Sequence, residues 1–221
     1  MVRSRPVSDQ TLILLVRHGE TPANTERVWH GSTDTPLSER GWAQARRVAE
    51  HLARHAAPAA ALYTSPLQRA AHTAKEIGKA LGLEASVDPD LAEYHLGSWE
   101  GRPYQELMAQ EDFWNRIRED PDFAPQGGES VRQVAERFAA AALRIAAAHP
   151  GQRAVVVSHG GTMALGLGWL LDRRHSSWKR VMNNCAVSEL VFDPEPRLLR
   201  FNVSEHLEGV DPVDPRDLRG A

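Results

Sequence analysis

Two short segments place a histidine at the end of an aliphatic run. Leu12–Val16 is followed by Arg17 and His18, and Ala154–Val157 is followed after one serine by His159. An apolar run without alternation is typical of a strand buried on both faces, as in a parallel sheet covered by helices. Ligands of open α/β sheets bind beyond the carboxyl ends of the strands, so these side chains stand where a site is expected.

A third apolar run, Ala59 to Tyr63, leads through a Thr-Ser-Pro turn to Arg69. If the three strands are parallel, two arginines and two histidines converge at one edge of the sheet. The guanidinium fork matches phosphate oxygens, and we expect backbone amides near Gly19 and at Gly160-Gly161 to add donors. The predicted guest is a phosphoryl group, although a surface ion pair for Arg69 or a structural role for His159 would explain either residue alone.

Strands and helices alternate along the chain, which predicts a three-layer α/β/α sandwich with a mostly parallel central sheet. Apolar residues at helical spacing and capping signals predict helices from about Ser38 to Arg54, Leu67 to Leu81, Ser130 to His149 and Thr162 to Leu171. Short strands are expected at Glu84 to Val87 and in a closing hairpin of Glu189–Phe192 and Leu198–Val203. Thr21 to Gly31 is expected to be irregular.

The length of 221 residues suits one domain, residues 1–221, with a core at about 10–204. A weakly helical stretch, broken from Pro121 to Gly128, predicts a small helical insertion over the site at about 102–128. The polar tail at about 205–221 is expected to be loose.

The formal net charge of -3 argues against a nucleic-acid partner, and Cys185 as the single cysteine excludes an internal disulfide or a thiolate cluster. No secretory signal or stretch long enough to cross a membrane is seen, so a soluble, cytoplasmic protein is expected. The expected partner is a small phosphomonoester. The oligomeric state, monomer or homodimer, stays open.

The chain resembles the histidine phosphatase superfamily, also called phosphoglycerate mutase-like. The resemblance covers most of Leu12 to Leu171 and rests on motifs in the family's order: Leu15-Val16-Arg17-His18-Gly19-Glu20-Thr21, Asn24 with Arg27, Gly31 to Gly41, Thr64-Ser65-Pro66-Leu67-Gln68-Arg69-Ala70, Leu91 to Gly101, Gly127-Gly128-Glu129-Ser130 and Val157-Ser158-His159-Gly160.

This resemblance implies that His18 is the nucleophile, that Arg17, Arg69 and His159 hold the transferring group, and that Glu93 protonates the leaving oxygen. A neutral imidazole can attack if its other N–H is fixed by an acceptor, and a carboxyl beside a phosphate can protonate an alcohol and later deprotonate water. No cofactor is expected. No metal is expected either, because Glu20 is the only obvious carboxylate near the two histidines.

Other residues of these motifs have two readings. The resemblance implies that Asn24 and Arg27 reach the substrate, and His30 and His95 lie in stretches that can face the pocket. Glu20 is expected to orient or support its neighbours. Glu100 is expected to cap or brace its loop. Three aromatic residues, Trp99, Phe113 and Trp114, are expected either to line the substrate entrance or to pack in the core.

The family contains mutases and phosphatases. Segment Arg102 to Gln126 is short and as acidic as it is basic, without the basic clamp of cofactor-dependent mutases, so a phosphatase resembling the α-ribazole phosphatase or broad-specificity branch is expected. The alternatives are phosphoglycerate mutase-type transfer and, less favoured, a catalytically silent phospholigand-binding or interaction protein.

Overall fold

The computed structural model describes residues 10–26, 28–55, 58–110, 112–177 and 179–210. Its centre is a six-stranded sheet in the order β4-β3-β6-β1-β7-β8. The first four of these strands are parallel, β7 runs antiparallel to β1, and β8 runs antiparallel to β7. Their bounds are β1 Thr11–Arg17, β3 Ala61–Thr64, β4 Ala85–Val87, β6 Arg153–Ser158, β7 Val187–Asp193 and β8 Glu195–Val203. The expected mostly parallel sheet and closing hairpin are confirmed.

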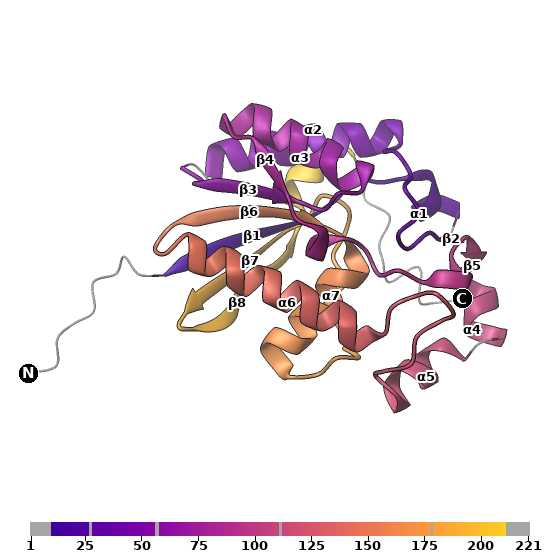
Figure 1. Ribbon diagram of the computed structural model, residues 1–221. Coiled ribbons are helices and arrows are strands. Elements are labelled where there is room, and N and C mark those ends of the chain that lie inside the picture. Colours follow the sequence, from indigo (N-terminus) through magenta and orange to yellow (C-terminus); the bar gives the residue numbers. More distant parts are fainter. Residues whose placement is uncertain (1–9, 27, 56–57, 111, 178, 211–221) are drawn as a thin grey trace, which may run out of the picture.

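Helices cover both faces of the sheet, which makes three layers (Figure 1). On one side Leu14 and Val16 pack with helices α2 (Glu39–His55) and α3 (Gln68–Leu81). On the other side Ile13 and Leu15 pack with α6 (Val131–Ala148) and α7 (Gly160–Asp172). Because successive strand residues point to opposite faces, the unbroken aliphatic run of β1 supplies both cores.

The helix signals in the sequence correspond to observed caps. At Ser130 the side chain accepts from the Gln133 amide and the Gln133 side chain accepts from the Ser130 amide, which is the expected capping box of α6. Gly82 ends α3 in a left-handed conformation with φ of 69°. Helix α7 begins at Gly160, earlier than the expected Thr162.

The register of the sheet brings three strand ends to one level. Val157 of β6 lies opposite Val16 of β1 on one side and opposite Thr64 of β3 on the other. The residues that follow these strands therefore meet at one edge of the sheet, as the sequence predicted.

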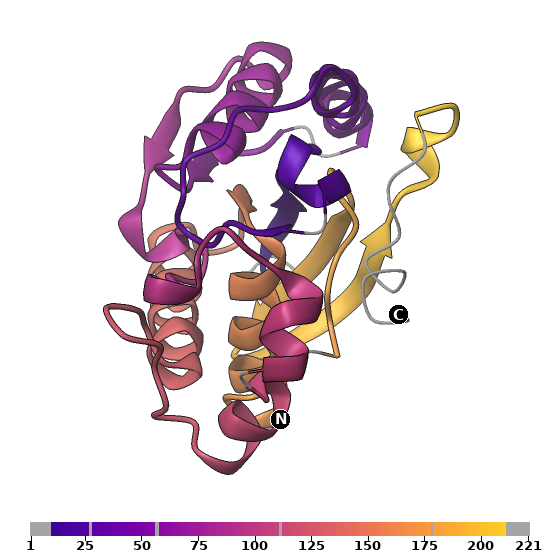
Figure 2. The same cartoon turned by 90° about the vertical axis from the view of Figure 1, so that its right-hand side faces the viewer.

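The insertion consists of two short helices, α4 (Tyr104–Gln110) and α5 (Phe113–Glu119). It is preceded by β5 (Arg102–Pro103), which pairs with β2 (Val28–Trp29) in a separate two-stranded sheet. Figures 1 and 2 show these helices at the end of the molecule toward which β1 runs. The insertion has its own apolar cluster, which joins it to the start of α6.

Two predictions about irregular segments need correction. The stretch Thr21 to Gly31 contains helix α1 (Pro22–Glu26) as well as β2. In the tail, a 3₁₀ turn at Glu205–Leu207 places Leu207 in the core beside α2, so the tail is anchored there by burial of an apolar side chain. Residues 211–221 lie outside the described part. Two other 3₁₀ turns, Pro89–Leu91 and Gly97–Trp99, flank the loop that carries Glu93.

Candidate active site

A cavity opens beyond the ends of β1 and β6. Most of the predicted site residues line it: Arg17, His18, Asn24, His30, Arg69, Glu93 and Gly160. Trp29, Tyr104 and Trp114 form another part of its wall, which brings the insertion over the site as predicted. Among the described residues, Gly19, His95 and His159 are not part of the lining. Arg27 lies outside the described residues.

His18 is buried, and hydrogen bonds fix both its backbone amide and its backbone carbonyl. Its backbone amide donates to the Ser158 carbonyl at 3.0 Å, and its own carbonyl accepts from the Asn184 side chain at 2.9 Å. In the ring, Nδ1 lies 2.7 Å from the Gly19 carbonyl oxygen. A carbonyl can only accept, so Nδ1 carries the proton and Nε2 keeps its lone pair.

The pKa of His18 is lowered well below its ordinary value of 6.5. Burial is the largest cause, followed by the positive charges of Arg69 and Arg17. The imidazole is therefore neutral at neutral pH, as a nitrogen nucleophile must be.

Arg17 reaches from the end of β1 to the segment that precedes β7. Its Nη1 donates to the Met182 carbonyl at 2.7 Å, and burial lowers its pKa from 12.5 to about 10, so it stays charged at neutral pH. The guanidinium lies against Gly160. A Cβ atom at that position would be 3.2 Å from the Arg17 Cζ, so the glycine leaves room for the cation.

Arg69 stands in the first turn of α3 and is oriented by three acceptors. Its Nε donates to His159 Nδ1 at 3.2 Å, and its terminal nitrogens donate to the carbonyls of Thr33 at 2.9 Å and Gly31 at 2.7 Å. The guanidinium plane is thus fixed by groups from two distant segments, with its cation against the cavity.

The loop that holds Arg69 is itself braced by Glu100. One carboxylate oxygen of Glu100 accepts from the Ser32 amide at 2.9 Å and hydroxyl at 2.6 Å, and the other accepts from the Thr33 hydroxyl at 2.6 Å. Burial alone raises the pKa of Glu100, but these hydrogen bonds outweigh it and lower the pKa. The bracing role expected for Glu100 is confirmed.

His159 lies behind Arg69. It is fully buried, and because its Nδ1 accepts from Arg69, its Nε2 donates to the Ser65 hydroxyl at 2.7 Å. Its ring centroid is 5.0 Å from that of His18. Burial first, and then the charge of Arg69, lowers the pKa of His159 well below 6.5. In this arrangement His159 orients Arg69, and direct contact with a transferring group stays a prediction.

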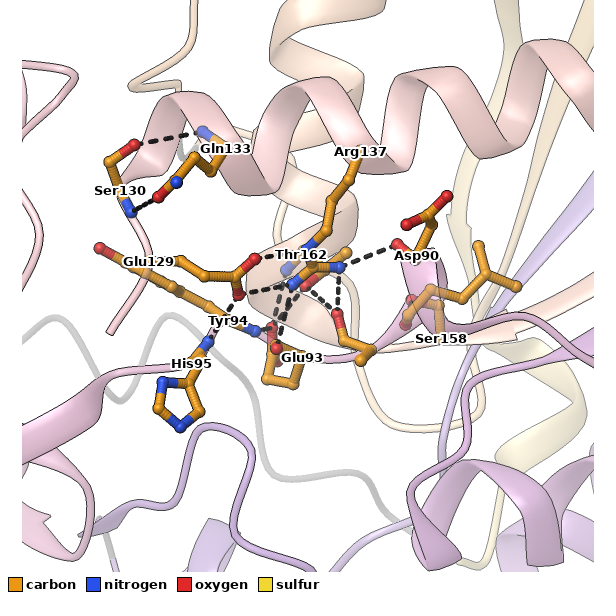
Figure 3. Close-up of polar contacts among 12 residues, drawn as sticks. Asp90, Glu93, Tyr94, His95, Glu129, Ser130, Gln133, Arg137, Ser158 and Thr162 are labelled. Atoms are coloured by element: carbon orange, nitrogen blue, oxygen red, sulfur yellow. Dashed lines mark hydrogen bonds and ion pairs between the residues drawn. The ribbon is translucent and has the colours of Figure 1, made fainter. Parts of the chain in front are cut away.

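Glu93 occupies the N-terminus of α7 (Figure 3). Its carboxylate accepts from the amides of Thr162 at 2.8 Å and Gly161 at 3.2 Å. The backbone amides of Gly161 and Gly19 were expected to donate to a phosphoryl group, and this needs correction. The Gly161 amide donates to Glu93, and the Gly19 amide donates to the Thr73 hydroxyl at 3.0 Å. The partial positive charge of a helix N-terminus attracts oxygen acceptors, and here the chain's own carboxyl group takes that place.

The remaining predicted residues divide into lining and supporting groups. Asn24 accepts from the Thr21 amide at 3.0 Å and lines the cavity. Glu20 is buried and accepts from the Ser38 hydroxyl at 2.9 Å, so it supports the loop as expected. His95 points its Nε2 to within 3.9 Å of Glu100, and the expectation that it faces the pocket is wrong.

The aromatic residues of the insertion have different positions. Trp114 lines the cavity, whereas Trp99 and Phe113 are buried in the apolar cluster of the insertion. Core packing is therefore the observed role of the latter two.

Sequence reasoning missed Arg137. This residue of α6 contacts the backbone of the Glu93 loop and pairs with Glu129 (Figure 3). Glu129 belongs to a motif noted in the sequence, but it precedes α6 and lies eight residues from Arg137, so the i,i+3 and i,i+4 spacing rule for helices gave no signal for this pair.

Within the described residues, no three His, Cys, Asp or Glu side chains are grouped closely enough to hold a metal ion. No helix of the described part is long and apolar enough to cross a membrane. The arrangement of a neutral imidazole, two arginines and a carboxyl group around one cavity suits phosphoryl transfer.

Comparison with known proteins agrees with this chemistry. A family model described as the histidine phosphatase superfamily, branch 1, matches residues 13–204. The chain is 42% identical over 189 residues to phosphoglycerate mutase-like protein 4 of Arabidopsis thaliana, covering 83% of this chain and 80% of that protein. It is 38% identical over 161 residues to a metal-independent phosphoserine phosphatase of the same plant, covering 71% of this chain and 67% of that protein.

Solved structures share the fold. A mycobacterial glucosyl-3-phosphoglycerate phosphatase in complex with VO3 matches with a TM-score of 0.77 and 33% identity, covering 87% of this chain and 99% of that one. A phosphoserine phosphatase mutant from Entamoeba histolytica in complex with phosphoserine matches with a TM-score of 0.81 and 28% identity, covering 89% and 99%. Similar proteins thus include both phosphatases and proteins named as mutase-like.

Proposed function

The chain belongs to branch 1 of the histidine phosphatase superfamily, and from this premise we propose that it hydrolyses small phosphomonoesters through a phosphohistidine on His18, without a metal. The observation that carries the proposal is the state of His18. Its Nδ1 is committed to the Gly19 carbonyl, and its pKa is lowered by burial and two arginines, which leaves Nε2 free to attack phosphorus.

In the first step Nε2 of His18 forms a bond to phosphorus while the bond from phosphorus to the ester oxygen breaks. Protonated Glu93 gives its proton to that oxygen, and the alcohol leaves. Arg17 and Arg69 neutralise the charge on the equatorial oxygens. Both arginines line the cavity with His18 and Glu93, which supports this assignment.

In the second step the Glu93 carboxylate takes a proton from water, and the water oxygen bonds to phosphorus. The nitrogen–phosphorus bond breaks, so inorganic phosphate leaves and His18 is neutral again. Glu93 returns to its protonated state, ready for another ester. Every atom and proton is supplied by the ester, water and this chain.

Hydrolysis is preferred to mutase transfer because of what faces the phosphoryl site. A mutase must retain a phosphorylated acid and return the group to it, which requires cations that grip a carboxylate. Among the described lining residues, the wall from β2 and the insertion presents Trp29, Tyr104 and Trp114. Mutase-type transfer is the second candidate, favoured by the similarity to phosphoglycerate mutase-like protein 4.

The test is turnover of 4-nitrophenyl phosphate by purified protein, with and without a strong chelator. We expect equal rates in both, and loss of turnover in His18→Ala. Activity that disappears with chelator and returns with a divalent metal would contradict the metal-free scheme. A coupled assay for interconversion of phosphoglycerates is expected to be negative, and a positive result would favour the mutase.

A further inference from the structure

The cavity has two chemically different ends. At one end the lining consists of His18, Arg17, Arg69 and Glu93. At the other end, Trp29 of β2 faces the insertion, with its ring 5.7 Å from Tyr104 and 6.4 Å from Trp114.

The aromatic side chains at this second end are fixed in place. Trp114 donates from its ring nitrogen to the Tyr104 hydroxyl at 3.2 Å, and Trp29 packs edge-on against buried Phe113 with centroids 4.9 Å apart. Val28 and Val181 extend the apolar surface of the cavity. A ligand whose phosphate meets the arginines therefore has its organic group against a preformed aromatic wall.

We propose, resting on the proposed function, that this site selects phosphomonoesters of aromatic or other apolar alcohols over esters whose alcohol carries a carboxylate. Desolvating a carboxylate against tryptophan rings costs free energy, whereas an aromatic ring gains contacts there. The phosphate provides the charge that the arginines require, so the alcohol needs no charge of its own.

The test compares four phosphate esters of weakly acidic, non-phenolic alcohols: benzyl phosphate, glycerol phosphate, phosphoserine and 3-phosphoglycerate. We expect kcat/KM to be highest for benzyl phosphate, by about tenfold or more over the two carboxylates. Trp114→Ala is expected to lower kcat/KM for benzyl phosphate by about tenfold more than for glycerol phosphate.

The matched control is Trp99→Phe, which alters the buried cluster of the insertion without touching the cavity lining. It should leave the order of substrates unchanged. Equal or higher kcat/KM for a carboxylate ester, or equal losses for benzyl and glycerol phosphate in Trp114→Ala, would overturn the proposal. Absence of any His18-dependent turnover would instead defeat the proposed function.

An independent observation concerns the loop that carries Glu93. Arg137 of α6 donates from Nη1 to the carbonyls of Asp90 at 2.8 Å and Ala92 at 2.7 Å, and from Nη2 to the carbonyl of Glu93 at 3.1 Å (Figure 3). Three backbone acceptors in an irregular segment are thus satisfied by one guanidinium from a rigid helix.

Glu129 fixes this guanidinium from the other side. Its two oxygens accept from Arg137 Nε at 2.7 Å and Nη2 at 2.9 Å, and one of them also accepts from the His95 amide at 3.0 Å. The exposed fractions of the two side chains are 17% and 25%, so the pair is largely shielded from water. The residues on both sides of Glu93 are therefore anchored to one bidentate ion pair.

We infer that Arg137 is a positioning residue for the proposed proton donor. Arg137 is not among the residues that line the cavity, but it fixes the backbone from which Glu93 reaches the start of α7. Release of this backbone lets the carboxyl group shift, and proton transfer depends steeply on such distances. This inference also rests on the proposed function of the site.

The positioning role of Arg137 is tested by how the rate depends on the leaving group. An acidic alcohol can leave as its anion, whereas a weakly acidic alcohol needs a proton from Glu93. We would measure kcat/KM, which reports the step that releases the alcohol, with 4-nitrophenyl, phenyl and benzyl phosphates, which share one ring and differ in the acidity of the alcohol. Arg137→Met is expected to lower kcat/KM for benzyl phosphate by at least about tenfold more than for 4-nitrophenyl phosphate. Arg137→Lys, which keeps one donor group, should lie between the wild type and Arg137→Met.

Arg144→Met is the matched control. Arg144 stands on the same helix and binds the side chains of Asp88 and Asp90 at 2.8 and 3.0 Å, but it is 54% exposed and its hydrogen bonds go to these side chains and not to the Glu93 backbone. It should show no change in leaving-group dependence. A uniform loss across the three esters in both Arg137 variants would assign Arg137 a purely structural role and overturn the inference. A wild type without His18-dependent turnover would defeat the proposed function instead.

Discussion

The Nδ1 atom of His18 lies 2.7 Å from the carbonyl oxygen of Gly19, the next residue in the chain. This contact is made within a single turn of backbone, directly after β1. It assigns the proton to Nδ1 and the lone pair to Nε2, so the reactive nitrogen is chosen by local geometry before any ligand arrives.

The first prediction concerns the covalent intermediate. Wild-type protein mixed rapidly with an aryl phosphate and quenched in alkali should carry phosphate on Nε2 of His18, because Nδ1 is blocked. Phosphorus NMR or mass spectrometry of the peptide identifies the nitrogen. His18→Ala should lose turnover by at least about 1,000-fold. Phosphate on Nδ1, or on another residue, would contradict the assignment.

A second prediction follows from the brace formed by Glu100. Glu100→Gln removes the charge that accepts from Ser32 and Thr33, and the loop whose carbonyls orient Arg69 should loosen. We expect kcat/KM to fall by about tenfold, with little change in the thermal midpoint.

The control for this change is Glu106→Gln, which removes the carboxylate of a partly exposed pair with Arg102. It should leave kcat/KM within about twofold of the wild type, because exposed ion pairs contribute little. Equal effects of the two substitutions would show that Glu100 acts only through general stability.

A third prediction uses the space beside Arg17. In Gly160→Ala the new Cβ would lie 3.2 Å from both Cζ and Nε of Arg17, at the end of a flexible side chain. The cation must shift by a few tenths of an ångström, while helix α7 accepts alanine well. We expect kcat/KM for 4-nitrophenyl phosphate to fall by about tenfold and the unfolding free energy to stay within about 1 kcal/mol.

The comparison for this variant is Gly41→Ala, where a Cβ would lie 2.1 Å from the backbone oxygen of Glu20. The backbone cannot move aside as the tip of a side chain can. Gly41→Ala should therefore lower the free energy of unfolding by about 3 kcal/mol or more, as overpacking a core does. If Gly160→Ala proved as unstable as Gly41→Ala, its effect on activity would carry no information about Arg17.

The fourth prediction concerns acid. His18 and His159 have pKa values well below 6.5, and burial together with the neighbouring charge of His206 lowers the pKa of His51 from 6.5 to about 4. Between these lowered pKa values and the ordinary value of about 6.5, the unfolded chain binds more protons than the folded chain. The unfolding free energy should therefore fall as the pH drops below about 6.5.

His51→Gln isolates one part of this effect. The variant lacks the imidazole that stacks on His206 with ring centroids 4.4 Å apart. We would measure the free energy of unfolding by urea between about pH 7 and about pH 4, the range over which such a histidine takes up its proton. This free energy should depend less on pH in His51→Gln than in the wild type. An identical dependence in both proteins would contradict the role of His51.

Several features could be read from the chain alone because they depend on neighbouring residues. The aliphatic runs before Arg17 and Ser158 indicate strands buried on both faces, and Ser130 with Gln133 marks a helix start. The parallel order of the strands then brings Arg17, His18 and Arg69 to one edge. Periodicity, capping and strand ends are local signals, and they were sufficient for these positions.

Other relationships were decided only by the tertiary structure. Glu93 takes the amides at the start of α7, His159 lies behind Arg69, and Arg137 holds the backbone of Glu93 from 44 residues away. Each depends on which buried donor finds which acceptor once the layers have packed. A sequence shows that a charged or polar group is present, whereas its partner is fixed by the geometry of segments that are distant in the chain.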